Sequence, residues 1–220
     1  MNIRISRLTF EYPHRTFRLH IPELEVASGS RVAFVGPSGS GKTTLLRLLA
    51  GIHLPESGSL SLDSVELPGL GDAARRAFRI TSIGFVFQDF QLIEYLNVEQ
   101  NIRLPFRINP ALNWTPEAAE RAEQLIAATG ITEKRKRGIN ELSQGESQRV
   151  AICRALVTQP NLVLADEPTG NLDPANKRKI LRILFEETEK RAATLVMVTH
   201  DRELLEGFQQ VIDFQDFHAE

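Results

Sequence analysis

The stretch that decides the fold reads Gly36-Pro37-Ser38-Gly39-Ser40-Gly41-Lys42-Thr43. It matches the pattern G-x-x-x-x-G-K-[ST], in which glycines let successive backbone N–H groups turn inward around phosphate oxygens because no Cβ blocks the turn. An apolar strand is expected at 31–35 before it and a helix at 42–50 after it, so the positive end of that helix points at the same anion. A glycine-rich turn without a ligand is the alternative, but it would not need this flanking strand and helix.

Each part of this loop has an expected contact with a nucleoside triphosphate. Lys42 is expected to reach the β- and γ-phosphates, and the Thr43 hydroxyl to ligate Mg²⁺. The nucleotide-binding residues expected here are Gly36, Pro37, Ser38, Gly39, Ser40, Gly41, Lys42, Thr43 and Thr44.

Two acidic residues end an apolar segment at 162–165. Asp166 would hold Mg²⁺ through water at the carboxyl edge of a sheet, where open α/β sheets bind ligands. Glu167 would orient or deprotonate the attacking water. A solvated acidic pair at the start of a loop is the alternative. The phosphate loop favours the catalytic interpretation, because phosphoryl transfer is catalysed by positioning and charge neutralisation.

Apolar segments alternate with helical ones, which favours an α/β fold with a mostly parallel sheet covered by helices. The first 30 residues instead predict short antiparallel strands around a turn at 13–15. Thr115 is the expected N-cap, Pro116 the first residue and Gly130 the end of one helix. The other elements expected are strands at 59–62, 83–87, 162–165, 194–198 and 211–214, and helices at 146–157 and 174–190.

The segment 88–158 reads as mainly helical and interrupts this alternation. We therefore expect one domain over 1–220, with a P-loop NTPase core and an N-terminal antiparallel β subdomain at about 1–87 and 159–220. An inserted helical subdomain is expected at about 88–158.

Composition narrows the classes of protein that fit. The net charge of −2 gives no general attraction to nucleic acid or anionic lipid. Cys153 is the one cysteine, which excludes an intrachain disulfide, fits a reducing compartment and is expected to be a core residue. There is no signal-peptide pattern at the N-terminus. Apolar runs such as 195–198 are far short of the roughly 18 residues that a membrane span needs.

A nine-residue segment upstream of the acidic strand decides the family: Leu142-Ser143-Gln144-Gly145-Glu146-Ser147-Gln148-Arg149-Val150. It resembles the signature of ABC ATPases, LSGGQ followed by a Gln-Arg helix. Gln144 replaces the first glycine and Glu146 the glutamine, whereas Ser143 and Gly145 remain at the positions that the resemblance expects to touch phosphate. A serine and a glycine at a helix N-terminus can bind an anion. A plain helix cap by Ser143 is the alternative.

The remaining motifs follow in the order of the ABC ATPase family over nearly the whole chain. Tyr12 resembles the adenine-stacking aromatic, with Phe17 as the substitute candidate. Gln88 resembles the Q-loop glutamine, which meets Mg²⁺ and the attacking water, and His200 resembles the switch histidine at the γ-phosphate. The segment 170–173 resembles the D-loop, with Asp173 as its acid.

Each of these residues has a structural alternative. Tyr12 would pack in the core, Gln88 would end a strand, His200 would be a structural histidine and Asp173 would cap a helix. The resemblance implies catalytic roles for Glu167, His200 and Gln88. It implies Mg²⁺ ligation by Thr43, Gln88 and Asp166.

The resemblance implies an ATP-hydrolysing subunit that uses ATP and Mg²⁺. Two copies would bind head to tail, with ATP between the phosphate loop of one copy and Ser143, Gln144, Gly145 and Glu146 of the other. The segments 165–173, 87–90 and 101–105 are similar to the group that releases lipoproteins, exports macrolides or peptides, or regulates cell division. A separate integral membrane permease subunit is implied, with this chain cytoplasmic and peripheral on the inner face of the cell membrane. Export or lipoprotein extrusion is the function expected, with a purely mechanical regulator as the alternative.

Two further segments have expected roles. By resemblance, residues after Gln88 receive a coupling helix of the membrane partner, and we expect a mixture of interface and core residues there. Phe90 and Tyr95 are the expected interface residues. The basic run 134–137 is either a solvated loop or a contact for lipid headgroups or an acidic partner surface.

Two other classes fit parts of the sequence. ABC-type ATPases that act on DNA or the ribosome usually carry coiled coils, zinc cysteines or two tandem cassettes. This chain has one phosphate loop and one cysteine, so no nucleic-acid partner is expected. A P-loop kinase of small molecules would not need 143–149 or His200. Slow ATP hydrolysis without an acceptor favours the transporter, and phosphoryl transfer to a metabolite favours the kinase.

Overall fold

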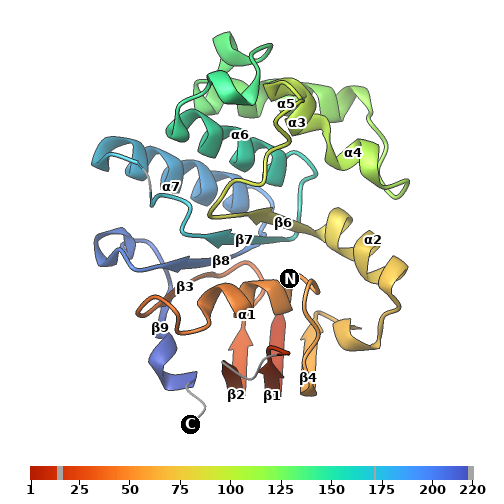
Figure 1. Ribbon diagram of the computed structural model, residues 1–220, viewed down its shortest axis with the longest axis vertical. Helices are drawn as coiled ribbons and strands as arrows, with labels where there is room; N and C mark the ends of the chain where they lie inside the picture. Colours follow the sequence, from red (N-terminus) through yellow and green to blue (C-terminus); the bar gives the residue numbers. More distant parts are fainter. Residues whose placement is uncertain (14–16, 171, 218–220) are drawn as a thin grey trace.

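The structure is a computed structural model that describes residues 1–13, 17–170 and 172–217. In the view of Figure 1, one β-sheet lies below a layer of helices and a second β-sheet lies lower still, with a helix between the two sheets. The larger sheet is parallel, with strand order β6-β7-β8-β3-β9, and the smaller one is antiparallel, with order β2-β1-β4-β5. The predicted α/β class with an antiparallel β subdomain is confirmed. The turn predicted at 13–15 lies mostly outside the described residues.

The parallel sheet separates two hydrophobic cores. Its strands are β3 (Arg31–Val35), β6 (Ile83–Val86), β7 (Leu162–Asp166), β8 (Thr194–Thr199) and β9 (Gln210–Asp213). Successive side chains of a strand point to opposite faces. Leu162 and Leu164 therefore pack into one core, whereas Val163 and Ala165 pack into the other. Burial on both faces explains why β3, β7 and β8 read as nearly continuous apolar runs, whereas β9 at the edge of the sheet is partly exposed.

The first core is shared by both sheets and by α1 (Lys42–Leu49). The antiparallel strands are β1 (Ile3–Glu11), β2 (Arg18–Val26), β4 (Ser57–Leu62) and β5 (Val65–Glu66). Alternation along β1 buries Ile3, Ile5, Leu8 and Phe10 against this core. The β subdomain therefore supports the helix that follows the glycine-rich loop.

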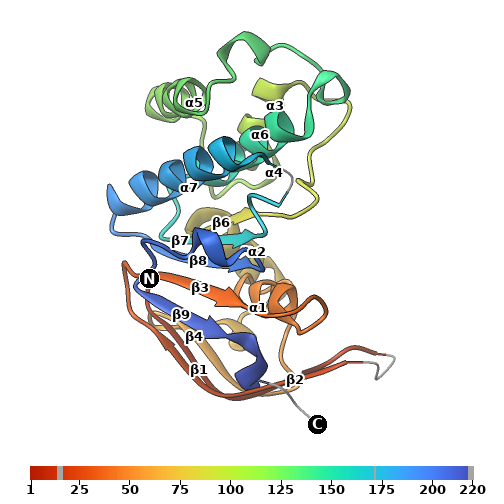
Figure 2. The same cartoon turned by 90° about the vertical axis from the view of Figure 1, so that its left-hand side faces the viewer.

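Five helices of the described residues lie on the opposite side of the parallel sheet. They are α3 (Val98–Arg103), α4 (Pro105–Ile108), α5 (Pro116–Thr129), α6 (Gln144–Leu156) and α7 (Pro174–Glu189). The last two of them, α6 and α7, contact strands of the sheet. In both Figure 1 and Figure 2, α3, α5 and α6 lie beyond α7, at the end of the molecule away from the antiparallel sheet. Four of these helices fall within the stretch expected to be helical. The division into two subdomains remains a prediction.

Local capping chemistry accounts for several helix ends. The Thr115 side chain accepts a hydrogen bond from the Ala118 N–H, and Gly130 ends α5 in the left-handed conformation, as predicted. The helix expected at 146–157 begins two residues earlier, at Gln144, because Ser143 caps it. Cys153 on α6 is fully buried, as expected. No described helix is both long enough and apolar enough to cross a membrane.

One helix, α2 (Asp72–Ser82), was not among the predicted elements. It has no fully buried residue. Its guanidinium groups instead hold the end of α1: Arg75 Nε donates to Gly51 O at 3.0 Å, and an Arg79 Nη donates to Ala50 O at 3.1 Å. Ala50 is the C-cap of α1 and Gly51 is the next residue, so no donor within the helix reaches their carbonyls. The position of α2 therefore depends on tertiary contacts more than on a buried stripe.

Candidate nucleotide site

The loop 36–41 joins β3 to α1 and needs glycine at two positions. Gly39 and Gly41 have φ angles of 82° and 100°, which side chains with a Cβ rarely adopt. A Cβ at Gly41 would also lie 2.4 Å from Cζ of the Phe17 ring. The left-handed backbone therefore favours glycine at position 41, and any side chain there would also displace the Phe17 ring.

Lys42 is buried and lies over its own loop. Its Nζ donates to Gly36 O at 2.9 Å and Pro37 O at 2.7 Å, and lies 3.3 Å from Ser40 Oγ. Burial lowers the pKa of Lys42, while the carboxylates of Glu167 and Asp166 act in the opposite sense. An ammonium group held at the start of a helix, above backbone donors, suits a polyphosphate.

Asp166 is the last residue of β7 and faces the start of α1. The Thr43 hydroxyl donates to Asp166 Oδ1 at 3.1 Å. Burial raises the pKa of Asp166, although the Thr43 hydrogen bond opposes this rise. A hydroxyl and a carboxylate side by side are hard oxygen donors, which Mg²⁺ prefers. The donor set that the structure brings together therefore fits the metal expected from the sequence.

Glu167 is held by the end of the neighbouring strand β8. Its Oε1 lies 2.7 Å from Nδ1 of His200, and its Oε2 accepts a hydrogen bond from the Thr199 hydroxyl at 3.3 Å. Its backbone N–H donates to Val198 O at 3.0 Å. Glu167 has φ of 45°, which costs a residue with a side chain about 1–3 kcal/mol and persists where surrounding contacts enforce it.

One cavity of about 750 Å³ brings most of the predicted residues together. The predicted residues that line it are Tyr12, Ser38, Gly39, Gly41, Lys42, Thr43, Thr44, Gln88, Asp166, Glu167 and His200. Gly36, Pro37 and Ser40 lie behind Lys42 and contact its ammonium group. Phe17, Gly170 and Val198 also line the cavity. Among the residues that the structure describes, its lining includes neither Asp173 nor any member of 143–146.

Two aromatic rings stand at the β-subdomain side of this cavity. The Tyr12 hydroxyl lies 3.2 Å from Thr44 Oγ1, and its ring packs edge-on against Phe10 at a centroid distance of 4.9 Å. Phe17 lies against the loop at Gly41. Tyr12 thus contacts the core and also lines the cavity, so both interpretations from the sequence have a structural basis. Stacking of either ring on adenine remains a prediction.

The signature segment and the D-loop acid both cap helices. Ser143 Oγ accepts from the Glu146 N–H at 3.3 Å, and Glu146 Oε2 accepts from the Ser143 N–H at 2.8 Å. Asp173 Oδ1 accepts from the N–H groups of Ala175 and Asn176, both at 3.1 Å. The capping alternative is therefore confirmed for Ser143 and Asp173. Contact with phosphate remains a prediction for Ser143, whose side chain is exposed. Asn171 of the D-loop lies outside the described residues.

Sequence reasoning missed Thr199 as a site residue. Its hydroxyl contacts the Glu167 carboxylate and also accepts from the Asp201 N–H at 3.0 Å. The signal was present, because Thr199 is the polar end of an apolar strand and immediately precedes His200. Its importance depends on the pairing of β7 with β8, which aligns Asp166 with Val198.

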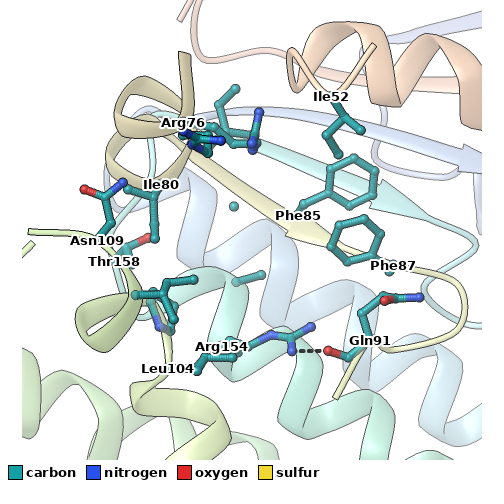
Figure 3. Close-up of a pocket in the computed structure, with 16 residues that line it drawn as sticks. Ile52, Arg76, Ile80, Phe85, Phe87, Gln91, Leu104, Asn109, Arg154 and Thr158 are labelled. Atoms are coloured by element: carbon teal, nitrogen blue, oxygen red, sulfur yellow. Dashed lines mark hydrogen bonds between the residues drawn. The ribbon is translucent and has the colours of Figure 1, made fainter. Parts of the chain in front are cut away.

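A second cavity, of about 320 Å³, lies between α2, β6, α4 and α6 (Figure 3). Phe85 and Phe87 stack in it, with ring centroids 4.0 Å apart. Arg154 of α6 donates to the carbonyls of Phe90 at 2.6 Å and Gln91 at 2.5 Å. Both of these residues have positive φ, 61° and 49°. One arginine therefore fastens the strained segment after Gln88 to the helix that carries the signature.

The segment expected to meet a partner has both exposed and buried side chains, and its contact with a partner remains a prediction. The Tyr95 side chain is 88% exposed, whereas Leu92 packs against the helical core. Ile52 and Ile108 line the second cavity and are also exposed. An exposed tyrosine and an apolar groove with exposed isoleucines are typical of a protein interface.

The basic run 134–137 is largely engaged within the chain. Lys134 pairs with Glu146 at 3.0 Å, Arg135 with Glu123 at 2.6 Å and Lys136 with Glu99 at 2.7 Å. Within the part of the chain that the structure describes, Lys134, Arg135 and Lys136 therefore have carboxylate partners, and the run connects the signature to α3 and α5.

Comparison with known proteins agrees with the family resemblance found in the sequence. The family profile described as ABC transporter matches residues 19–170. The lipoprotein-releasing system ATP-binding protein LolD of Chromohalobacter salexigens is 42% identical over 197 residues, which cover 90% of this chain and 82% of that protein. The uncharacterized ABC transporter ATP-binding protein YknY of Bacillus subtilis is 37% identical over 211 residues, covering 96% of this chain and 90% of that protein.

Solved structures agree with this result. The chain is similar to the dimeric structure of MJ0796, a bacterial ABC transporter cassette, with a TM-score of 0.86 and 30% identity, covering 96% of this chain and 94% of the other. A second dimeric structure of that cassette, in a post-hydrolysis state bound to ADP and phosphate, has a TM-score of 0.85 at the same identity and coverage.

Proposed function

This chain belongs to the ABC transporter family as an ATP-hydrolysing subunit of the LolD group, and we propose that two copies of it close on ATP to drive a separate membrane subunit. The observation that carries this proposal is the composition of the nucleotide cavity. It contains the phosphate loop, both acids, Gln88 and His200, but the described residues that line it include none of 143–146. A second copy can supply that segment.

The proposed roles follow from the geometry of the site. Lys42 and the N–H groups of the loop bind the β- and γ-phosphates, supported by the N-terminus of α1. Thr43, Asp166 and Gln88 hold Mg²⁺, which neutralises phosphate charge when bound. Glu167 accepts a proton from water or orients it, and His200 and Thr199 hold its carboxylate in position.

The head-to-tail arrangement adds the signature of the opposite copy. Because Ser143 lies at the N-terminus of α6, its hydroxyl and the first N–H groups of that helix can meet a γ-phosphate from outside. The dimeric structures of the similar cassette support an assembly of two copies. Hydrolysis would then require both copies, since neither has a complete site alone.

Replacing Ser143 with arginine tests this division of the site. We expect ATP turnover to fall on the order of a hundredfold, the usual cost when a positioned donor no longer reaches the developing charge, because the long arginine side chain holds the N-terminus of α6 away from the γ-phosphate. ATP binding should remain within about threefold, because the phosphate loop of the same copy is unchanged. Turnover is measured by phosphate release and binding by a fluorescent nucleotide.

Thr115→Arg is the matched control, because Thr115 also caps a helix, α5, but does not line the nucleotide cavity. Both variants lose an N-cap, which costs about 1 kcal/mol of stability. Full turnover by Ser143→Arg would exclude the two-copy site. An equal loss of turnover in Thr115→Arg would show that the loss comes from a destabilised fold and not from the site.

We propose that the groove in Figure 3 receives a short helix of the membrane subunit. Phe87 and Gln91 line the groove, and Gln88 between them lines the nucleotide cavity, so an occupant of the groove would contact the segment that contains Gln88. Because relatives of this chain are named lipoprotein-releasing system proteins, we propose lipoprotein or peptide extrusion as the transport reaction. The chain would be peripheral on the inner face of the cell membrane.

Ile108→Glu is expected to weaken association with the membrane subunit at least tenfold, because it places a charge on the exposed apolar rim of this groove. Val211→Glu is the control, because Val211 is similarly apolar and exposed but lies on β9, outside the groove. The measurement is co-purification from detergent-solubilised membranes, with identification of the bound subunit by mass spectrometry. Equal recovery with both variants would place the partner elsewhere. Recovery of a cell-division subunit would favour the mechanical function over transport.

A further inference from the structure

A lysine of the basic run is bound to the signature itself. Lys134 is in the short 3₁₀ helix Thr132–Lys134, and its Nζ lies 3.0 Å from Glu146 Oε1. The other carboxylate oxygen of Glu146 accepts the Ser143 N–H. Both side chains are mostly enclosed, with 29% of Lys134 and 17% of Glu146 exposed. The pair is therefore less screened by water than a surface ion pair.

Glu146 brings a full negative charge to this helix N-terminus. The hydrogen bond from the Ser143 N–H and the contact with Lys134 lower the pKa of Glu146 to about 2, so the side chain is ionised at neutral pH. A carboxylate suits the end of a helix when no other anion is present. It opposes a second anion at the same place, because like charges repel.

The negative charge of Glu146 therefore conflicts with the binding of a phosphate at this helix N-terminus. In the two-copy site, the N-terminus of α6 faces the triphosphate bound by the other copy, and glutamine at position 146, as in the signature that this segment resembles, would add no charge there. We propose that Lys134 is a positioning residue for the ATP bound by the opposite copy: it neutralises Glu146 and fixes its carboxylate in the helix cap. This inference rests on the proposed two-copy site and extends it by a residue outside the signature.

The neighbouring cations do not provide this neutralisation. Arg135 pairs with Glu99 and Glu123, and Lys136 pairs with Glu99. Of the run 134–137, Lys134 is the residue that has an ion pair with Glu146 in the described structure. Without Lys134, the cap would remain through Ser143, but the signature would present an uncompensated carboxylate to phosphate.

The experiment compares four variants in the Glu167→Gln background, in which ATP is not consumed. The ATP concentration for half-maximal dimerisation is measured by light scattering in the presence of Mg²⁺. Lys134→Ala should raise it about tenfold, because repulsion between Glu146 and phosphate is no longer compensated. Glu146→Gln should lower it two- to threefold, since glutamine can also complete the capping box and Lys134 is left with a free charge.

The double variant Lys134→Ala/Glu146→Gln should return to within about threefold of the parent, because both charges are gone. Lys136→Ala is the control and should change nothing, since its partner is Glu99. Raising the salt concentration should shrink the defect of Lys134→Ala, because the repulsion is electrostatic. Thermal unfolding of each variant reports any loss of fold.

A purely structural ion pair gives a different pattern. In that case Glu146→Gln would impair dimerisation as much as Lys134→Ala, the double variant would not recover, and the inference would be wrong. An unchanged Lys134→Ala would also overturn it. If the Glu167→Gln parent does not dimerise at any ATP concentration, the proposed two-copy site itself fails, and this inference fails with it.

Discussion

Replacing Lys42 with alanine is expected to weaken ATP binding by two to four orders of magnitude. The ammonium group is buried beside the loop and is expected to contact two phosphate groups. A hydrogen bond to a charged group contributes about 1.5–3 kcal/mol, so two such contacts correspond to about 3–6 kcal/mol. Each 1.4 kcal/mol changes a dissociation constant tenfold.

Titration calorimetry with ATP and Mg²⁺ measures this loss. Lys179→Ala is the matched control, because Lys179 is exposed on α7 and does not line the nucleotide cavity. Lys42 also donates to the carbonyls of Gly36 and Pro37, so circular dichroism should establish that the variant is folded. A folded Lys42→Ala protein that binds ATP within threefold of the unchanged chain would contradict the assignment of the phosphate loop.

Replacing Glu167 with glutamine is expected to lower the turnover number by about 10²–10⁴, the usual contribution of a general base. Glutamine has nearly the same shape as glutamate and can keep hydrogen bonds with Thr199 and His200, but it cannot accept the proton of the attacking water. ATP binding should persist, because the phosphate loop is unaltered. The variant therefore separates binding from hydrolysis.

Phosphate release under single-turnover conditions measures the chemical step for this variant. Glu206→Gln is the control, since it makes the same change at an exposed position outside the nucleotide cavity. Hydrolysis by Glu167→Gln within tenfold of the unchanged chain would move the role of base to another group. Loss of ATP binding in the same variant would instead indicate damage to the site.

That the candidate nucleotide-site residues meet at one cavity could be predicted because their signals are local. The glycine-rich loop requires a strand before it and a helix after it, and the sequence 31–50 contains all three. Asp166 and Glu167 follow an apolar strand, so the parallel arrangement of the sheet brings them to the edge where α1 begins. Order along the chain then identified Gln88 and His200, which line the same cavity.

The features that were missed depend on contacts distant in sequence. Helix α2 has no buried stripe, and its arginines bind carbonyls at the end of α1, more than 20 residues away. Thr199 acquires its role from the pairing of β7 with β8. In the sequence, Lys134 is one member of a basic run. Its contact with Glu146 depends on the turns before α6, which bring the two side chains together.

The signature was ambiguous in the sequence for a physical reason. The same side chain can serve a helix cap and an anion site, because a serine hydroxyl accepts a hydrogen bond from a backbone N–H and can donate its own hydrogen to an anion. In this chain Ser143 makes the cap and keeps an exposed side chain. The second role therefore depends on what approaches from outside the chain.

The central claim is that ATP joins two copies of this chain. Its most direct test is the mass of the Glu167→Gln variant in saturating ATP and Mg²⁺, determined by size-exclusion chromatography with light scattering. We predict twice the 24.7 kDa of one chain, with return to 24.7 kDa when ATP is omitted or Ser143→Arg is added. A single-chain mass at saturating ATP, also with the membrane subunit present, would contradict the account.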